Sequence, residues 1–244
     1  MAGKPEHCTG CPLYEAPGPV WGVGSRHSKL FLLGEAPGGT EVITGVPFTG
    51  GSGRVLNRML GQAGIDRKTT YITNVVKCRP AHRSHLGLKD RPPTDEEIRH
   101  CAHYLLAELE EVAPNLVLAL GATALYVLRG RNDIGNRRGV PLATEGGQKY
   151  LATFHPAAIM RQQQLWPIPV IDMQRAKAEA ETPALVRVPV CYNTKPDPLV
   201  DGLALLDRCR ALGVCYADIE TTGLDPHRDT VVCIGLTDRP QAAE

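Results

Sequence analysis

The sequence predicts an α/β fold between residues 29 and 180, in which helices cover both faces of a parallel sheet. Strand-like and helix-like patterns alternate along this stretch, which is typical of sheets whose parallel strands are connected by helices. The loops richest in glycine and polar residues follow Gly34, lie within 71–76 and follow Phe154. Because ligands bind at the carboxyl edge of such sheets, these three loops predict a binding site there.

Each element is predicted by its own pattern. Apolar and β-branched runs predict strands over residues 29–35, 70–78, 115–121 and 149–156. Amphipathic spacing predicts helices over residues 51–64, 94–112, 122–130 and 168–181. The second of these helices begins with a capping box formed by Thr94 and Glu97.

The chain divides into two parts by composition. Residues 1–182 are expected to form one domain, and residues 183–198 a linker that contains prolines and lacks periodicity. Residues 199–244 follow with a short helix and two strand-like runs, 213–221 and 230–238.

Charge and hydropathy exclude some classes of protein. The chain has 244 residues and a formal net charge of +1, so any attraction to a polyanion depends on local clusters. It has no apolar run of about 18 residues and no hydrophobic signal region, so we expect a cytoplasmic protein without a membrane partner. In that compartment its eight cysteines are expected to be thiols or metal ligands.

Four cysteines are candidate ligands. Cys8 and Cys11 form a CxxC pair, Cys78 ends a predicted strand, and Cys101 lies in the helix after a long loop. Four thiolates can hold zinc or an iron–sulfur cluster, and a single tight pair favours the cluster. The alternative is that Cys78 and Cys101 are small buried residues.

The loop "GEAPGGTEVITGVPFTGGSGR", residues 34–54, lacks the lysine of a P-loop and the spacing of a dinucleotide fingerprint. Phe48 within it is a candidate stacking platform, or a core residue. The amide of Asn74 can read the O4 and N3–H of a pyrimidine, or form a turn. His155 at a strand end can stabilise a developing anion, or be a satisfied structural histidine.

Two carboxylates and a helix start complete the candidate site. Glu35 and Glu41 could orient or activate water, the alternatives being a helix cap and a solvated side chain. Ser52 and Gly53 open a helix whose amides could receive a backbone phosphate. Together these residues indicate a pocket for an extruded pyrimidine.

The motifs "GEAPGGTE", "PFTGGSGRVL", "YITNVVKCRP" and "TFHPAAIMR", with the four cysteines, resemble family 4 uracil-DNA glycosylases from Cys8 to Ala180. The resemblance implies a three-layer αβα sandwich around a central parallel four-stranded sheet. It implies a monomeric base-excision-repair enzyme that hydrolyses the bond between uracil and deoxyribose in DNA and leaves an abasic site. It also implies a [4Fe-4S] cluster, bound by Cys8, Cys11, Cys78 and Cys101.

The resemblance assigns roles to individual residues. Glu35 and Glu41 match the acidic positions of the first motif, and Phe48 matches the stacking aromatic residue. Asn74 matches the amide that selects uracil, and His155 matches the group that stabilises the leaving uracil anion. The other residues expected at the substrate are Ala36, Gly38, Ser52 and Gly53.

One departure is the string "GGT" directly before Glu41, where relatives often carry more acids, and it leaves open which carboxylate handles water. Ala36 stands where the superfamily's first branch has an aspartate, so the mechanism of that branch does not transfer directly.

The string "YADIETTGLDP" resembles the first motif of the DEDD 3′–5′ exonuclease domain fused to A-family DNA polymerases, which has a ribonuclease H-like fold. Asp218 and Glu220 alternate on a predicted strand, so they would share a face and hold a divalent metal. We expect an incomplete and inactive exonuclease domain, from a bacterial or phage glycosylase–polymerase fusion. Mg²⁺ or Mn²⁺ would be a cofactor only of a complete domain.

Two groups of basic residues predict contacts with DNA phosphates, although some would be ordinary solvated charges. The first group is Lys77, Arg79, His82, Arg83, His85, Lys89 and Arg91, and the second is Arg129, Arg131, Arg137 and Arg138. A different interpretation of the same features is a non-catalytic iron–sulfur module that binds DNA on behalf of a polymerase.

Overall fold

The computed structural model divides the chain into two compact units, Met1–Leu185 and Val186–Glu244. The structure describes residues 4–5, 8–85 and 87–185 of the first unit, and 203–204, 207, 210–211, 216–221 and 231–237 of the second. Most of the predicted linker, residues 186–198, lies outside the described residues.

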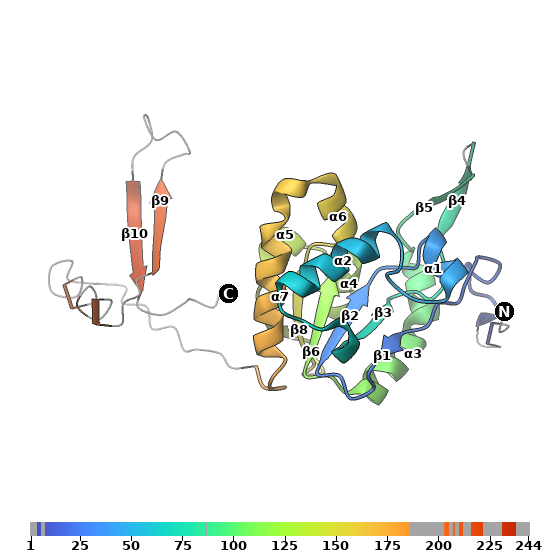
Figure 1. Cartoon of the computed structure of the whole chain (residues 1–244), viewed down its shortest axis with the longest axis horizontal. Coiled ribbons are helices and arrows are strands. Elements are labelled where there is room, and N and C mark those ends of the chain that lie inside the picture. Colours follow the sequence, from blue (N-terminus) through green and yellow to red (C-terminus); the bar gives the residue numbers. More distant parts are fainter. Residues whose placement is uncertain are drawn as a thin grey trace. The chain divides into compact units, whose positions relative to one another are not determined.

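A six-stranded sheet forms the centre of the first unit, with the order β1-β3-β2-β6-β8-β7 (Figure 1). The strands are β1 (Val23–Gly24), β2 (Leu30–Gly34), β3 (Tyr71–Asn74), β6 (Leu116–Leu120), β7 (Leu142–Ala143) and β8 (Lys149–Thr153). The four inner strands are the four predicted ones, and they run parallel. The prediction of a purely parallel four-stranded sheet is wrong, because β1 and β7 add short antiparallel edges.

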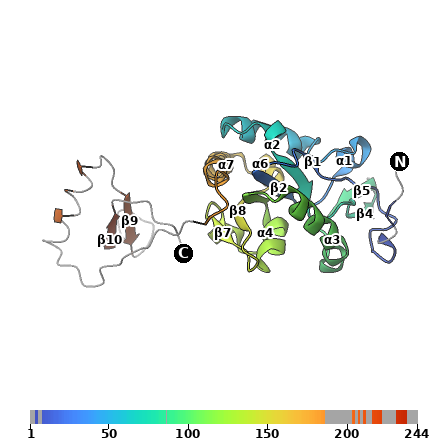
Figure 2. The same ribbon diagram turned by 90° about the horizontal axis from the view of Figure 1, so that it is seen from below.

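Helices cover both faces of this sheet (Figure 2). They are α1 (Gly39–Thr44), α2 (Gly51–Gln62), α3 (Asp95–Val112), α4 (Ala122–Arg129), α5 (Ile134–Arg137), α6 (Pro156–Arg161) and α7 (Pro167–Glu179), with the 3₁₀ turns η2 (Arg67–Thr69) and η3 (Gln163–Leu165). The predicted capping box of α3 is present, since Thr94 accepts from the Glu97 amide and Glu97 accepts from the Thr94 amide. Among the described residues, no helix combines the length and the apolar character needed to cross a membrane.

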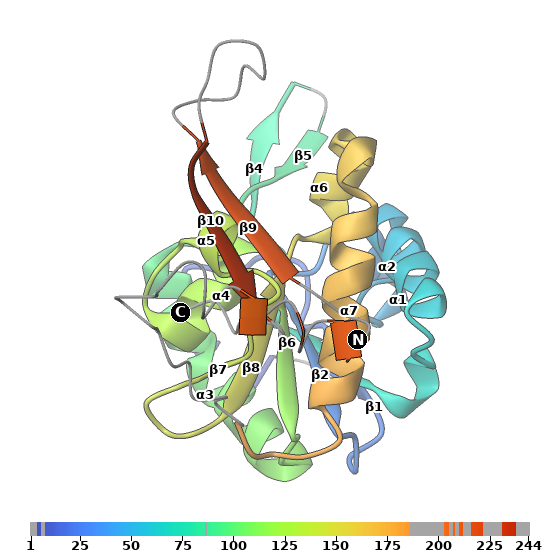
Figure 3. The same cartoon turned by 90° about the vertical axis from the view of Figure 1, so that its left-hand side faces the viewer.

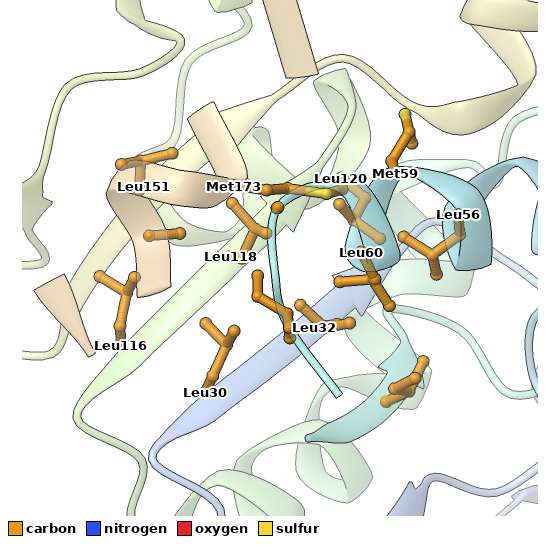
Figure 4. Close-up of a cluster of buried hydrophobic side chains, with 14 of the residues drawn as sticks. Leu30, Leu32, Leu56, Met59, Leu60, Leu116, Leu118, Leu120, Leu151 and Met173 are labelled. Carbon is orange, nitrogen blue, oxygen red and sulfur yellow. The ribbon is translucent and has the colours of Figure 1, made fainter. Parts of the chain in front are cut away.

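The central strands β2 and β6 are buried on both faces, which explains their unbroken apolar sequences. Side chains alternate across the sheet, so Leu30 and Leu32 join the core formed with α2, α6 and α7 (Figure 4). Phe31 and Leu33 join the second core, which includes residues of α3 and α4. This alternation produces the three layers of helix, sheet and helix.

The predicted basic loop after β3 folds instead as a hairpin of β4 (Ala81–Ser84) and β5 (Gly87–Asp90). The hairpin extends away from the body of the first unit (Figure 1 and Figure 3). Gly87 has φ of +104°, a conformation that glycine adopts without strain. The observed strand is shorter than the predicted strand over residues 70–78, because β3 spans only Tyr71–Asn74.

In the second unit, β9 (Tyr216–Thr221) pairs antiparallel with β10 (Val231–Thr237). The register places Asp218 opposite Gly235 and Glu220 opposite Cys233. The two strand predictions in this segment are confirmed, whereas its ribonuclease H-like fold stays a prediction.

Candidate active site

A cavity of about 770 Å³ opens at the carboxyl ends of the four parallel strands, where the sequence places the three polar loops. Eight of the predicted site residues line it: Glu35, Ala36, Gly38, Glu41, Phe48, Ser52, Asn74 and His155. They come from the loops after β2 and β8, from the start of α2 and from the end of β3.

Asn74 lies at the buried end of this cavity. Its side chain is 2% exposed, and its Oδ1 atom has no hydrogen-bond partner within the described residues. A buried amide oxygen without a partner carries a free-energy cost of about 1–3 kcal/mol. The atom is therefore available to a donor on a bound ligand.

Phe48 packs beside Asn74 over the same glycine. A Cβ on Gly34 would lie 2.3 Å from Asn74 Oδ1 and 2.5 Å from Phe48 Cζ, so only glycine allows this approach. Phe48 is 5% exposed and belongs to the apolar core, and it also lines the cavity. Its ring lies 5.9 Å from that of His155, centroid to centroid. The two interpretations of Phe48, core residue and ligand platform, are thus compatible.

The backbone at Phe48 is held in an unusual conformation. Its φ is +55°, which is uncommon for a residue with a side chain. Arg67 donates to the carbonyl oxygens of Pro47, at 2.8 Å, and of Phe48, at 3.3 Å. Gly53 is outside the cavity lining, and its Cβ would lie 1.9 Å from Phe48 O, so it permits close packing beneath this backbone.

His155 caps the N-terminus of α6. Its Nδ1 accepts a hydrogen bond from the Ala157 amide at 3.1 Å, so the neutral ring carries its proton on Nε2. Burial, with a smaller contribution from the charge of Arg161, lowers the pKa of His155 to about 4. At neutral pH this residue is therefore an uncharged Nε2–H donor at the cavity wall.

The two glutamates have different surroundings. Glu41 is 6% exposed; its Oε1 accepts from the amides of Thr49 and Gly50, at 3.1 and 2.8 Å, and its Oε2 from that of Gly38 at 3.2 Å. Glu35 is only partly buried and accepts from the Thr123 hydroxyl. Glu41 therefore stabilises the loop through hydrogen bonds from backbone amides, and one of these bonds caps the start of α1. Glu35 accepts from one hydroxyl group, so its carboxylate retains more capacity to bind a water.

Sequence reasoning missed Thr123, Arg67 and Arg161. Thr123 lies in the first turn of α4, where a threonine gives no signal of contact with a carboxylate 88 positions away. Arg161 ends the short helix after His155 and lines the cavity.

The four candidate cysteines line a second, small cavity and are free thiols. Cys101 Sγ accepts from the Lys77 amide at 3.3 Å, and Cys8 Sγ lies 3.4 Å from the Tyr104 hydroxyl. Burial raises the pKa of Cys101 to about 11 and also raises that of Cys78. Among the described residues, no three His, Cys, Asp or Glu side chains are placed to hold a single metal ion. The four thiols around one cavity supply the number of sulfur ligands that a zinc ion or an iron–sulfur cluster would need.

Lys77 is not a surface DNA contact, contrary to the prediction. It is 1% exposed, and its Nζ donates to Thr73 Oγ1, the Asn74 carbonyl oxygen and Glu108 Oε2 at 2.7, 2.8 and 2.7 Å. Other predicted basic contacts are engaged in ion pairs, namely Arg79, Arg91, Arg129, Arg137 and Arg138.

Comparison with known proteins identifies the family of this chain. The family model for the "Uracil DNA glycosylase superfamily" matches residues 21–180. A "Type-4 uracil-DNA glycosylase" from Thermotoga maritima is 40% identical over 183 residues, which cover 73% of this chain and 92% of that protein. A protein of the same name from Archaeoglobus fulgidus is 36% identical, with coverage of 65% and 80%.

A "DNA polymerase" from Bacillus phage SP01 is 27% identical over 221 residues. That match covers 88% of this chain, so it extends past Leu185, but only 23% of the polymerase. From the family model and the type-4 relatives, the chain belongs to the uracil DNA glycosylase superfamily and, within it, to the type-4 family.

Proposed function

We propose that this protein removes uracil from DNA by hydrolysing the N-glycosidic bond, which leaves an abasic site for repair. The observation that carries the proposal is the unpaired Oδ1 of Asn74, buried where a base can enter the cavity. Uracil N3–H is a donor that would satisfy this acceptor, whereas cytosine presents an unprotonated N3 at the same place. An opposed pair of acceptors is strongly unfavourable, so the site discriminates between the two bases.

The extruded base stacks on Phe48 in this proposal, while its polar edge faces Asn74. The volume of about 770 Å³ accommodates a nucleotide, and extrusion is needed because the reacting bond is inaccessible within a stacked duplex. Ser52, at the start of α2, supports a backbone phosphate beside the cavity.

The bond between C1′ and N1 breaks as its electron pair moves onto uracil. His155 Nε2–H donates a hydrogen bond to the uracil oxygen on which negative charge develops, and it does so without changing its own protonation state. A water oriented by Glu35 adds its oxygen to C1′ and transfers a proton to the carboxylate. The uracil anion takes a proton from solvent, and Glu35 releases the proton it received from water to solvent, which completes the hydrolysis.

We propose that Cys8, Cys11, Cys78 and Cys101 hold a [4Fe-4S] cluster. When bound, the cluster would cross-link the N-terminal segment to the chain after β3 and to α3, a structural role close to Asn74. Anaerobically purified protein is expected to be brown, with a broad visible absorption band and bound iron and sulfide. Colourless protein with one tightly bound zinc would contradict this assignment.

For the second unit, we propose that β9 belongs to an exonuclease-like fold in which Asp218 and Glu220 are metal ligands. Their alternation on one strand and the match to the phage polymerase beyond Leu185 support this proposal.

The direct test is incubation with an oligonucleotide that contains one uracil, followed by alkali. We expect strand scission at the uracil and none in a matched oligonucleotide with thymine at that position. Protein that binds the uracil oligonucleotide without producing an alkali-labile site would support the non-catalytic interpretation instead.

A further inference from the structure

The β4–β5 hairpin concentrates exposed basic side chains. His82, Arg83, His85 and Lys89 are exposed. None of them takes part in an ion pair among the residues that the structure describes. The only acidic residue between positions 81 and 90 is Asp90, which Arg79 engages at 2.6 Å.

The base of the hairpin is fixed beside the active-site cavity. Arg91, directly after β5, binds Glu97 of the α3 capping box at 2.5 Å, and its amide donates to the Pro80 carbonyl at 3.1 Å. Pro80, Asp90 and Arg91 all line the cavity. The base of the hairpin therefore lies next to the cavity, and the contacts of Arg91 with Glu97 and Pro80 fix its position.

The strand register identifies which face of the hairpin points toward the cavity. Side chains alternate along each strand, and Arg83 pairs with Leu88 whereas His82 pairs with Lys89. Asp90 lies two positions after Leu88 and lines the cavity, so Leu88 and Arg83 share its face. His82 and Lys89 occupy the opposite face.

We propose that the hairpin is a DNA-contacting arm, in which Arg83 binds a backbone phosphate of the strand that carries the extruded nucleotide. Arg83 is a planar donor suited to phosphate, and Leu88, 47% exposed beside it, provides an apolar surface for the adjoining deoxyribose. The contact positions the strand and carries no sequence preference. This inference rests on the proposed uracil excision, because it places the damaged strand at the cavity.

The test compares Arg83→Gln with Lys89→Gln, which removes the same charge from the opposite face of the same hairpin. Lys68→Gln is the remote control. Lys68 lies in η2, directly before β3, at the end of that strand that is distant from the cavity. The probe is a duplex with a tetrahydrofuran abasic analogue, which has no base to release. Its dissociation constant is measured over a range of salt concentrations.

Arg83→Gln is expected to weaken binding about 5- to 10-fold. It should also make the dependence of the logarithm of the association constant on the logarithm of the salt concentration less steep, by about 1 in the magnitude of the slope. Lys89→Gln should have a smaller effect, and Lys68→Gln should match the wild type. Equal losses in Arg83→Gln and Lys89→Gln, or an unchanged slope in Arg83→Gln, would overturn the proposal.

The single-turnover rate of uracil release at saturating enzyme distinguishes an effect of the hairpin on DNA binding from an effect on bond cleavage. Lys68→Gln should release uracil at the wild-type single-turnover rate, and in Arg83→Gln this rate should fall by a smaller factor than the DNA affinity. Wild-type protein that shows the Arg83-dependent salt slope without releasing uracil would refute the proposed function and leave the arm supported.

Discussion

Individual residues of the cavity carry separable tasks, and Asn74 carries base selection. Asn74→Asp replaces the amide with a carboxylate, which removes the donor and places a charge opposite uracil. We expect uracil release to fall by about 100-fold, because a site built to pair a polar edge discriminates strongly. Single-turnover kinetics measures this, and an unchanged rate would remove Asn74 from base recognition.

At the same scale, His155 combines a structural hydrogen bond with a catalytic one. His155→Asn keeps an acceptor for the Ala157 amide, whereas His155→Ala loses both groups. Both variants should slow base release at least about 10-fold while DNA affinity changes less, because the Nε2–H acts on charge that develops in the transition state. Equal losses of rate and affinity would indicate a purely structural histidine.

His155 also predicts how stability depends on pH. Its folded-state pKa of about 4 lies below the ordinary histidine value, so between these pH values the unfolded chain binds a proton that the folded protein does not. The free energy of unfolding should therefore fall as pH decreases from about 6.5 to 4, by up to about 3 kcal/mol from this residue. His155→Asn should lack this part of the loss in denaturant titrations, and the same pH dependence in both proteins would contradict the assignment.

At the scale of elements, the end of β3 is joined to α3 by the buried pair of Lys77 and Glu108. Lys77→Met leaves the Glu108 charge without its partner, at a cost of about 3–5 kcal/mol. Lys77→Met combined with Glu108→Gln removes that charge and keeps an acceptor for the Gly22 amide, which Glu108 Oε1 binds at 3.0 Å. The double variant should regain much of the stability lost by Lys77→Met in urea unfolding. A double variant as unstable as the single one would show that the charge itself matters little.

For the whole molecule, we predict that the second unit does not act as a nuclease in this chain. A two-metal exonuclease needs several carboxylates around two ions about 4 Å apart, and Asp218 with Glu220 supplies only part of that set. The chain should not shorten a 3′ end in Mg²⁺ or Mn²⁺, and limited proteolysis should leave a fragment near residues 1–185 that still excises uracil. Metal-dependent shortening that Asp218→Ala abolishes would contradict this.

Much of the first unit was predictable because its signals are local. The central strands β2 and β6 are apolar on both faces, and the residues that line the cavity lie at or after the carboxyl ends of the parallel strands. The edge strands β1 and β7 contain two residues each, too few for any periodicity, and their pairing depends on contacts distant in sequence. Lys77 was misassigned because its partner Glu108 lies 31 positions away, and no sequence pattern shows that a lysine is enclosed.

The bare surface of Gly34 has an entropic consequence. Phe48 and Asn74 both press against this glycine, so their side chains have lost rotamer freedom before any base arrives. Immobilising a rotamer-rich side chain on binding costs about 0.5–1.5 kcal/mol, and a base that enters between groups already confined avoids that cost. Because Gly34 has no methyl group, Phe48 and Asn74 are already ordered in the cavity before a base binds.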